Sequence, residues 1–264
     1  MLSGTAVDAA IVVTDLRKTY ATVEAVRGIS FVVRRGTTTA LLGGNGAGKT
    51  TTLSMLLGVL TPTAGRVTVL GEEMPKERRR VLPRINFTSP YVDLPKRLTV
   101  GENLAVFADL YGVRRARERI AAVAEDCDLV ALLKRPYGTL SAGQRTRVSL
   151  AKAVINEPDV LLLDEPTASL DPDIGDRMRT YLEGYQRRTG CTMLLASHHM
   201  GEVERMCDDV IMLREGRVVD QGSPSALIAR YGRANMEEVF LDIARGRIGE
   251  PIVGSGAEEI TTFG

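Results

Sequence analysis

The chain has few cysteines, no long apolar run and no excess of charge of either sign. Its three cysteines, Cys127, Cys191 and Cys207, are scattered, without the spacing of a metal site or a redox pair. They are typical of free thiols in a reducing compartment. No apolar run reaches the length that a membrane-spanning helix needs, and the N-terminus lacks a signal-peptide pattern. We therefore expect a soluble, cytoplasmic protein whose association with a membrane depends on a partner.

The balance of charge bears on possible partners. The 34 Lys and Arg residues against 33 Asp and Glu residues give a formal net charge of +1. Such a balance provides no overall field to attract nucleic acid, so we expect no nucleic-acid partner. At 264 residues and 44% hydrophobic content, the chain can bury a sizeable core, and single α/β domains of this size are ordinary.

One stretch, LLGGNGAGKTT at residues 41–51, contains the phosphate-loop pattern G-x-x-x-x-G-K-[ST]. The apolar run 40–42 predicts a buried strand before it, and leucines at helical spacing predict a helix over 51–59. Glycines let the intervening backbone turn tightly and aim its N–H groups at anionic oxygens, and the helix adds its positive N-terminal end. A glycine-rich connection that binds nothing is the alternative. The flanking strand and helix and the Lys49-Thr50 pair argue against it.

We therefore expect this loop to bind a nucleoside triphosphate. Lys49 would reach the outer phosphates as a point charge, and the Thr50 hydroxyl would help to hold Mg²⁺. The expected nucleotide-binding residues of the loop are Gly43, Gly44, Asn45, Gly46, Ala47, Gly48, Lys49, Thr50 and Thr51.

Two later apolar runs, 160–165 and 192–198, read as strands that end in polar residues. Continuous apolar strands separated by helices predict a parallel sheet covered on both faces, with ligands beyond the carboxyl ends of its strands. There Asp164 would suit Mg²⁺, and Glu165 would polarise the attacking water as general base. His198 would contact the γ-phosphate or orient that water. Helix capping is the alternative for the Asp-Glu pair, and the phosphate loop makes it the weaker one.

The N-terminal region carries two β-rich runs, 11–13 and 29–33, which predict an antiparallel sheet before the loop strand. Tyr20 lies between them. A flat ring there could stack on a purine base, although the residue type alone is more typical of a half-buried strand position.

The middle of the chain, about 90–155, reads as a helical insertion between strands of the main sheet. A capping box at Thr99 and Glu102 predicts a helix to about residue 111, and a second, charged helix is expected over 114–125. Towards the C-terminus we expect a helix to about residue 207, a hairpin over 210–219 and a last helix over 235–245.

The segment LSAGQ at 140–144 opens another helix. Ser141 and Gln144 form a capping box, which is a sufficient structural reason for them. However, Gly143 at a helix N-terminus also makes an anion site. The phosphate loop already has its own helix, so a second such site indicates either two ligands or one ligand held between two copies of the chain.

Five motifs occur in one order along the chain. They are the phosphate loop 43–50, LSAGQ at 140–144, LLLDEP at 161–166, Ser-Leu-Asp at 169–171 and Ser-His at 197–198. In this order they resemble the ATP-binding cassette (ABC) ATPases. LSAGQ followed by LLLDEPTASLD is highly specific to that family.

The resemblance covers about residues 11–222. It implies an α/β fold: a P-loop NTPase with a mainly parallel core sheet, an N-terminal antiparallel β-subdomain and an inserted helical subdomain at about 90–155. The ATPase domain would span residues 1–246. Residues from about 247 onward carry Gly and Glu with little periodicity, so we expect a flexible tail at 247–264. The implied cofactors are ATP and Mg²⁺.

The same resemblance assigns roles to single residues. Tyr20 would stack on adenine, and His198 would be the switch histidine. Asp171 would lie in the D-loop at a dimer interface. The signature residues would reach the γ-phosphate of ATP bound on the other subunit; they are Ser141, Gly143 and Gln144.

The implied partners are a second copy of the chain or a paralogous cassette, and separately encoded transmembrane permease subunits. The protein would then be peripheral on the inner face of the cell membrane. The single cassette and the ending at 235–241 look like the exporter branch that includes drug, polysaccharide and nodulation-factor transporters.

The sequence departs from the family pattern at two places. Ala142 replaces the first signature glycine, which leaves Gly143 intact. Ser89 and Pro90 stand where the family usually carries a glutamine that meets Mg²⁺ and water and links the site to the membrane domain. Ser89 offers a shorter oxygen there. Hydrolysis would be slower, or coupling would run through residues 91–94.

Two other functions stay open at this point. One is a soluble cassette ATPase that acts on ribosomes or DNA, although such proteins usually carry tandem cassettes or long coiled-coil insertions. The other is an ATP-gated binding module that dimerises but hardly hydrolyses ATP. Co-purification with a membrane protein separates the exporter subunit from the first, and a steady-state ATPase assay separates it from the second.

Overall fold

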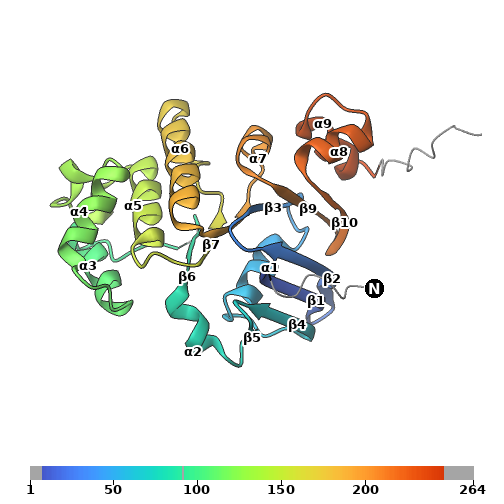
Figure 1. Cartoon of the computed structure of the whole chain (residues 1–264), viewed down its shortest axis with the longest axis horizontal. Coiled ribbons are helices and arrows are strands. Elements are labelled where there is room, and N and C mark those ends of the chain that lie inside the picture. Colours follow the sequence, from blue (N-terminus) through green and yellow to red (C-terminus); the bar gives the residue numbers. More distant parts are fainter. Residues whose placement is uncertain (1–7, 91, 247–264) are drawn as a thin grey trace, which may run out of the picture.

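The computed structural model describes residues 8–90 and 92–246, and within these ranges the chain forms two β-sheets with helices packed around them (Figure 1). The N-terminal sheet is antiparallel, with strand order β2-β1-β4-β5. Its strands are β1 (Ala9–Tyr20), β2 (Val23–Arg34), β4 (Ala64–Val69) and β5 (Glu72–Met74). The predicted antiparallel sheet before the loop strand is confirmed.

The core sheet has strand order β10-β9-β3-β8-β7-β6 and is parallel except for β10. Its strands are β3 (Thr38–Leu42), β6 (Ile85–Thr88), β7 (Val160–Asp164), β8 (Thr192–Ala196), β9 (Asp209–Arg214) and β10 (Arg217–Gly222). Every residue of β3, β7 and β8 is buried, because both faces of the sheet are covered. The mainly parallel core sheet is therefore confirmed.

Helices supply the covering layers (Figure 1). They are α1 (Lys49–Leu56), α2 (Arg78–Val81), α3 (Val100–Leu110), α4 (Ala116–Asp126), α5 (Ala142–Val154), α6 (Pro172–Thr189), α7 (Met200–Met206), α8 (Pro224–Tyr231) and α9 (Met236–Ala244). Short 3-10 turns cover Leu82–Arg84, Val130–Leu132 and Tyr137–Thr139. The expected helical insertion is present as α3, α4 and α5, which stand together beside β6 and β7 in Figure 1.

The core sheet separates two hydrophobic cores, since successive side chains of a strand point to opposite faces. Leu161 and Leu163 of β7 belong to the core shared with helices α3 to α9. Val160 and Leu162 belong to the core that contains α1 and the N-terminal sheet. This arrangement fixes the carboxyl ends of β3, β7 and β8 along one edge.

Several boundaries differ from those expected from the sequence. The helix after the phosphate loop spans Lys49–Leu56 rather than 51–59, and the two N-terminal strands are 12 residues each rather than short runs. Helices α6 and α8 were not expected from the sequence. The tail 247–264 and Tyr91, in the proposed coupling segment 91–94, lie outside the described residues.

Candidate functional site

The loop 43–48 joins β3 to α1 and depends on glycine at two points. Gly48 has a φ of 102°, in the left-handed region, and a Cβ there would lie 2.8 Å from the carbonyl oxygen of Ala25. A Cβ on Gly43 would collide with the carbonyl oxygen of Leu213. The loop is therefore fitted closely between β2 and the end of β9. Its tip, Gly44-Asn45-Gly46, is exposed.

Lys49 begins α1 and folds back over the loop. Its ammonium group donates a hydrogen bond to the carbonyl oxygen of Gly43 and another, at 3.2 Å, to that of Gly44. Burial lowers the pKa of Lys49, whereas the negative charges of Glu165 and Asp164 raise it. These charges act on Lys49 because β3 and β7 deliver their polar residues to the same edge of the sheet. The predicted convergence of the loop and the carboxylates is thus observed.

The two threonines that follow the lysine occupy the first turn of α1. Thr50 is exposed and Thr51 is half-buried.

Asp164, the last residue of β7, is only 7% exposed. Burial, and secondarily the charge of Glu165, raise the pKa of the Asp164 carboxyl, while a hydrogen bond from Ser89 and the charge of Lys49 lower it. A buried carboxylate with a raised pKa is one that a bound cation would stabilise.

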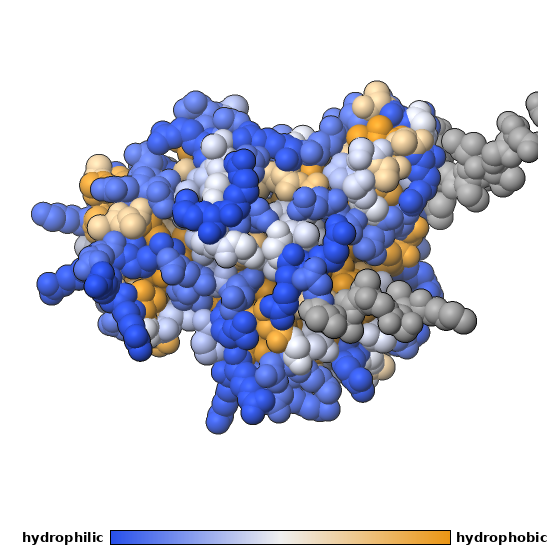
Figure 2. Space-filling view, in the orientation of Figure 1, coloured by the Kyte–Doolittle hydropathy of each residue, from blue (hydrophilic) through white to orange (hydrophobic). Residues whose placement is uncertain are grey.

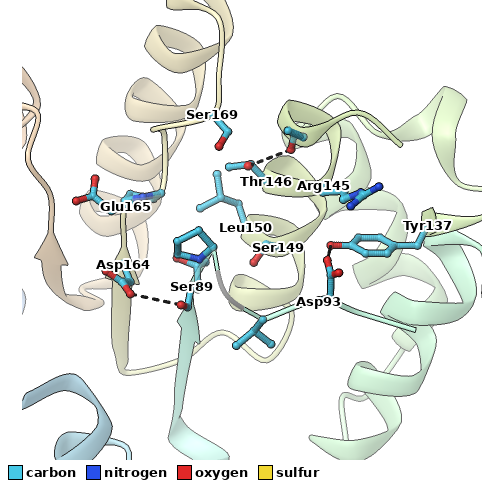
Figure 3. Close-up of a pocket in the computed structure, with 15 residues that line it drawn as sticks. Ser89, Asp93, Tyr137, Arg145, Thr146, Ser149, Leu150, Asp164, Glu165 and Ser169 are labelled. Carbon is cyan, nitrogen blue, oxygen red and sulfur yellow. Dashed lines mark hydrogen bonds between the residues drawn. The ribbon is translucent and has the colours of Figure 1, made fainter. Parts of the chain in front are cut away.

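Ser89, which stands where the resemblance leads us to expect a glutamine, reaches this carboxylate. Its hydroxyl donates a 3.3 Å hydrogen bond to Oδ2 of Asp164 (Figure 3). A cavity of about 170 Å³ lies beside the pair, and Arg145, Thr146 and Ser149 of α5 form its wall in Figure 3. This contact agrees with the expectation that Ser89 offers a shorter oxygen at this place in the chain.

Glu165 is held by its backbone and by a histidine. Its φ of 50° is unusual for a residue with a side chain, and its N–H donates to the carbonyl oxygen of Ala196 at 2.8 Å. His198 Nδ1 lies 2.7 Å from Glu165 Oε1. The Glu165 side chain is 20% exposed and that of His198 66%. The predicted base and the predicted switch histidine therefore form one pair, open to solvent on the histidine side.

The signature segment forms the predicted capping box. The Ser141 hydroxyl accepts from the Gln144 N–H at 3.3 Å, and Gln144 Oε1 accepts from the Ser141 N–H at 3.0 Å. A Cβ on Gly143 would lie 3.1 Å from the carbonyl oxygen of Ser169, so glycine allows close packing against the segment that carries Asp171. Ser141 is exposed, and Gly143 and Gln144 are half-buried.

The signature segment and the phosphate loop of the same chain line different cavities. The cavity beside the loop, about 240 Å³, is formed by loop residues 43–47, residues 212–215 at the end of β9, and Phe240, Ile243 and Ala244 of α9. No residue of 140–144 lines it. Ala142 of this segment lines the other cavity, beside Ser89 and Asp164.

Tyr20 ends β1 and is 46% exposed, with Lys18 Nζ 5.2 Å from the centre of its ring. It pairs with Val23 on β2, the strand whose Ala25 contacts the phosphate loop. An exposed ring on this hairpin is free to stack on a planar ligand, so the arrangement is compatible with the predicted role in base binding.

Sequence reasoning missed one buried carboxylate close to these residues. Glu202 of α7 is 2% exposed and accepts hydrogen bonds from Thr167 and Ser197. Thr167 follows the Asp164-Glu165 pair, and Ser197 precedes His198. In the sequence Glu202 reads as an ordinary acidic residue in the first turn of a helix, so no local signal identified it.

Among residues 8–90 and 92–246, no helix is both long and apolar enough to cross a bilayer. The same residues contain no group of three or more His, Cys, Asp or Glu side chains arranged to hold a metal ion. A Mg²⁺ site built on Thr50 and Asp164 would therefore take its other ligands from phosphate and water. That is the usual manner in which proteins bind this ion.

Known proteins are similar to this chain over most of its length. A family model described as "ABC transporter" matches residues 26–168. The "Nod factor export ATP-binding protein I" of Ralstonia nicotianae is 40% identical over 236 residues, covering 87% of this chain and 72% of that protein.

Two solved structures are similar over most of their length. The "ATP binding subunit of ABC transporter" has a TM-score of 0.82 at 26% identity and covers 89% of this chain and 99% of its own. The cbiO1 protein of Clostridium perfringens, described as part of the ABC transporter complex cbiONQ, has a TM-score of 0.74 at 30% identity, with coverages of 92% and 98%.

Proposed function

This chain belongs to the ATP-binding subunits of ABC transporters, a family of ATPases, and from that premise we propose how its residues bind and hydrolyse ATP and what it works with. The observation that carries the proposal is the meeting of Lys49, Asp164, Glu165 and His198 at the carboxyl edge of the core sheet. We take residues 1–246 as the ATPase domain, with the helical subdomain at about 90–155.

In this proposal the loop 43–51 binds the phosphates of ATP through its N–H groups and the N-terminus of α1. Lys49 exchanges its two carbonyl contacts for the outer phosphates, because an ammonium group binds an anion more strongly than a neutral carbonyl oxygen. Thr50 and Asp164 would hold Mg²⁺, which neutralises charge on the phosphates when it is bound. Tyr20 would stack on the adenine ring.

Glu165 acts on the attacking water as general base. Its backbone hydrogen bond to Ala196 and its pairing with His198 hold the carboxylate at the end of β7. The base is therefore pre-organised before the substrate binds. His198, mostly exposed, orients the water or contacts the γ-phosphate from the side on which a ligand would enter. The chain thus supplies both a base and the group that positions it.

We propose that the ATP site is completed by a second copy of the chain. The signature residues Ser141, Gly143 and Gln144 form a helix N-terminus at the surface, yet they do not line the cavity at their own phosphate loop. A helix N-terminus attracts anions. Two copies arranged head to tail would each place this N-terminus against the nucleotide on the other.

A transmembrane permease would supply the membrane partner, and the protein would act from the inner face of the cell membrane. A largely apolar groove of about 300 Å³ lies between the end of α1, the segment before β6, and Tyr111 at the end of α3. Val59 and Leu110 near it are 78% and 74% exposed. Figure 2 shows a mostly hydrophilic surface with separate apolar patches over the helical region and over α8–α9.

Since the curated relatives are named as export proteins, we propose that the complex is an exporter.

The assignment is tested by steady-state ATPase and ATP-binding measurements on the purified chain. Glu165→Gln should lower kcat by at least about 100-fold, because the general base is lost, while the Kd for ATP changes less than about threefold. Glu118→Gln, which removes an exposed carboxylate on α4, is the matched control and should hydrolyse ATP as the unaltered chain does. Equal kcat in the Glu165→Gln variant and the unaltered chain would exclude Glu165 as the base.

A further inference from the structure

Glu202 is a buried carboxylate without a cationic partner. It lies in the first turn of α7 and is 2% exposed. Within residues 8–90 and 92–246, no Lys, Arg or His nitrogen lies within 4.0 Å of its oxygens. Burying a carboxylate costs free energy unless hydrogen bonds replace the lost water. The hydrogen bonds that Glu202 accepts in place of water therefore indicate its role.

Both oxygens of Glu202 accept hydrogen bonds from buried hydroxyl groups. Oε1 accepts from Thr167 at 2.9 Å, and Oε2 accepts from Ser197 at 2.7 Å. Thr167 is 7% exposed and Ser197 1%. The Ser197 oxygen in turn accepts from the N–H of His199 at 3.1 Å. One carboxylate thus joins two segments, those that follow β7 and β8.

These two segments carry the proposed base and its histidine. Thr167 is two residues after Glu165, and Ser197 immediately precedes His198. No hydrogen bond or ion pair in the described part of the chain joins Glu202 to either Glu165 or His198. Glu202 therefore contacts neither side chain of the pair by a polar contact, and it joins the two backbone segments that carry them.

Helix capping does not account for these contacts. An acidic residue in the first turn is favoured by the helix dipole, but this effect does not require burial. In a capping box the carboxylate would accept from the N-cap N–H, whereas here the His199 N–H donates to Ser197. The oxygens of Glu202 point instead at the two hydroxyl groups.

We propose that Glu202 is a positioning residue, which fixes the separation of Glu165 and His198 by holding Thr167 and Ser197 together. This inference rests on the proposed function, because that function gives Glu165 and His198 their roles in ATP hydrolysis. The carboxylate suits this position because it can accept from two hydroxyl groups at once, and its two oxygens are rigidly spaced.

The first test compares two carboxylates on one helix. Glu202→Gln keeps the shape but replaces one acceptor oxygen by a donor, so one of the two hydroxyl groups loses its acceptor. We expect kcat for ATP to fall about 10-fold, as a small misplacement of reacting groups implies, with the Kd for ATP within about twofold. Glu204→Gln, whose side chain accepts from the Met236 N–H, should retain the kcat of the unaltered chain.

The second test separates positioning from general damage to the fold. Glu202→Gln is combined with His198→Ala in a double-mutant cycle. If Glu202 acts through the pair of Glu165 and His198, Glu202→Gln lowers kcat less than twofold in the His198→Ala variant. Thr167→Val, which removes one hydroxyl donor without changing shape, should also lower kcat only when His198 is present, and it carries the test if Glu202→Gln does not fold.

The outcomes distinguish a failure of the proposed function from a failure of the positioning role of Glu202. An unchanged kcat in His198→Ala alone would refute the proposed role of His198 and the inference with it. A lowered kcat in His198→Ala, combined with independent, multiplicative losses from Glu202→Gln or Thr167→Val, would leave the proposed function intact and overturn the role of Glu202.

Discussion

The buried Lys152 should make the stability of this protein depend on pH in a way that a single substitution reveals. Lys152, on the signature helix α5, is 5% exposed. Its ammonium group donates to the carbonyl oxygen of Phe87 at 2.6 Å and to Asn86 Oδ1 at 3.2 Å. Among the described residues it has no carboxylate partner. It therefore ties α5 to β6, the strand that leads to Ser89, through neutral groups only.

The magnitude follows from the pKa of Lys152. Burial lowers this pKa from 10.5 to about 8. The unfolded chain therefore binds the proton more tightly, and keeping Lys152 charged in the fold costs about 3 kcal/mol near pH 7. The cost shrinks as pH rises from about 8 to about 10.5, because the folded chain releases its proton first. The contribution of Lys152 to the free energy of unfolding thus rises with pH in this window.

Lys152→Met removes the titrating group and, at every pH, its hydrogen bonds to the Phe87 carbonyl oxygen and to Asn86 Oδ1. We expect the free energy of unfolding of the variant, relative to that of the unaltered chain, to fall by about 2 kcal/mol between pH 7 and pH 9.5. Urea denaturation followed by circular dichroism measures it. Lys134→Met, which removes an exposed ammonium group, controls for the change in net charge. A difference in the free energy of unfolding between variant and unaltered chain that is constant over this range would show that burial does not lower the pKa of Lys152.

Four further predictions follow from the site and the core. Lys49→Ala should raise the Kd for ATP at least about 10-fold by calorimetry, and an unchanged Kd would exclude its role in phosphate binding. Ser89→Ala should raise the Mg²⁺ concentration needed to saturate the nucleotide complex about fivefold, whereas Ser149→Ala, in the wall of the same cavity, should not. Tyr20→Ala should weaken ATP binding about fivefold and Tyr20→Phe should not, because stacking needs only the ring. The three cysteines are buried, and burial raises the pKa of each thiol, so DTNB should label them only after unfolding; rapid labelling of the native chain would contradict their burial.

Much of the fold was accessible from the sequence because the elements around the site have strong local signals. The buried strands β7 and β8 are uninterrupted apolar runs, and the capping boxes at Thr99 and Ser141 mark the starts of α3 and α5. These signals depend on neighbours along the chain. Such local signals do not depend on contacts between distant segments, and for this reason the predicted β7, β8, α3 and α5 agree with those observed.

The parts that were missed depend on contacts between distant segments. β1 and β2 are longer than expected, since shifts in their pairing, as between Val13 and Leu16, interrupt the alternation of apolar and polar residues. Glu202 meets Thr167, 35 residues away, only in the folded chain. The contact of Ser89 with Asp164 spans 75 residues. No sequence pattern encodes such pairings.

The structure of the Glu165→Gln variant with ATP and Mg²⁺ shows whether a second copy of the chain completes the ATP site. We expect a dimer in which each γ-phosphate lies on loop 43–50 of one copy and within about 3 Å of a donor from residues 140–144 of the other. An assembly in which those residues are far from every γ-phosphate would contradict it.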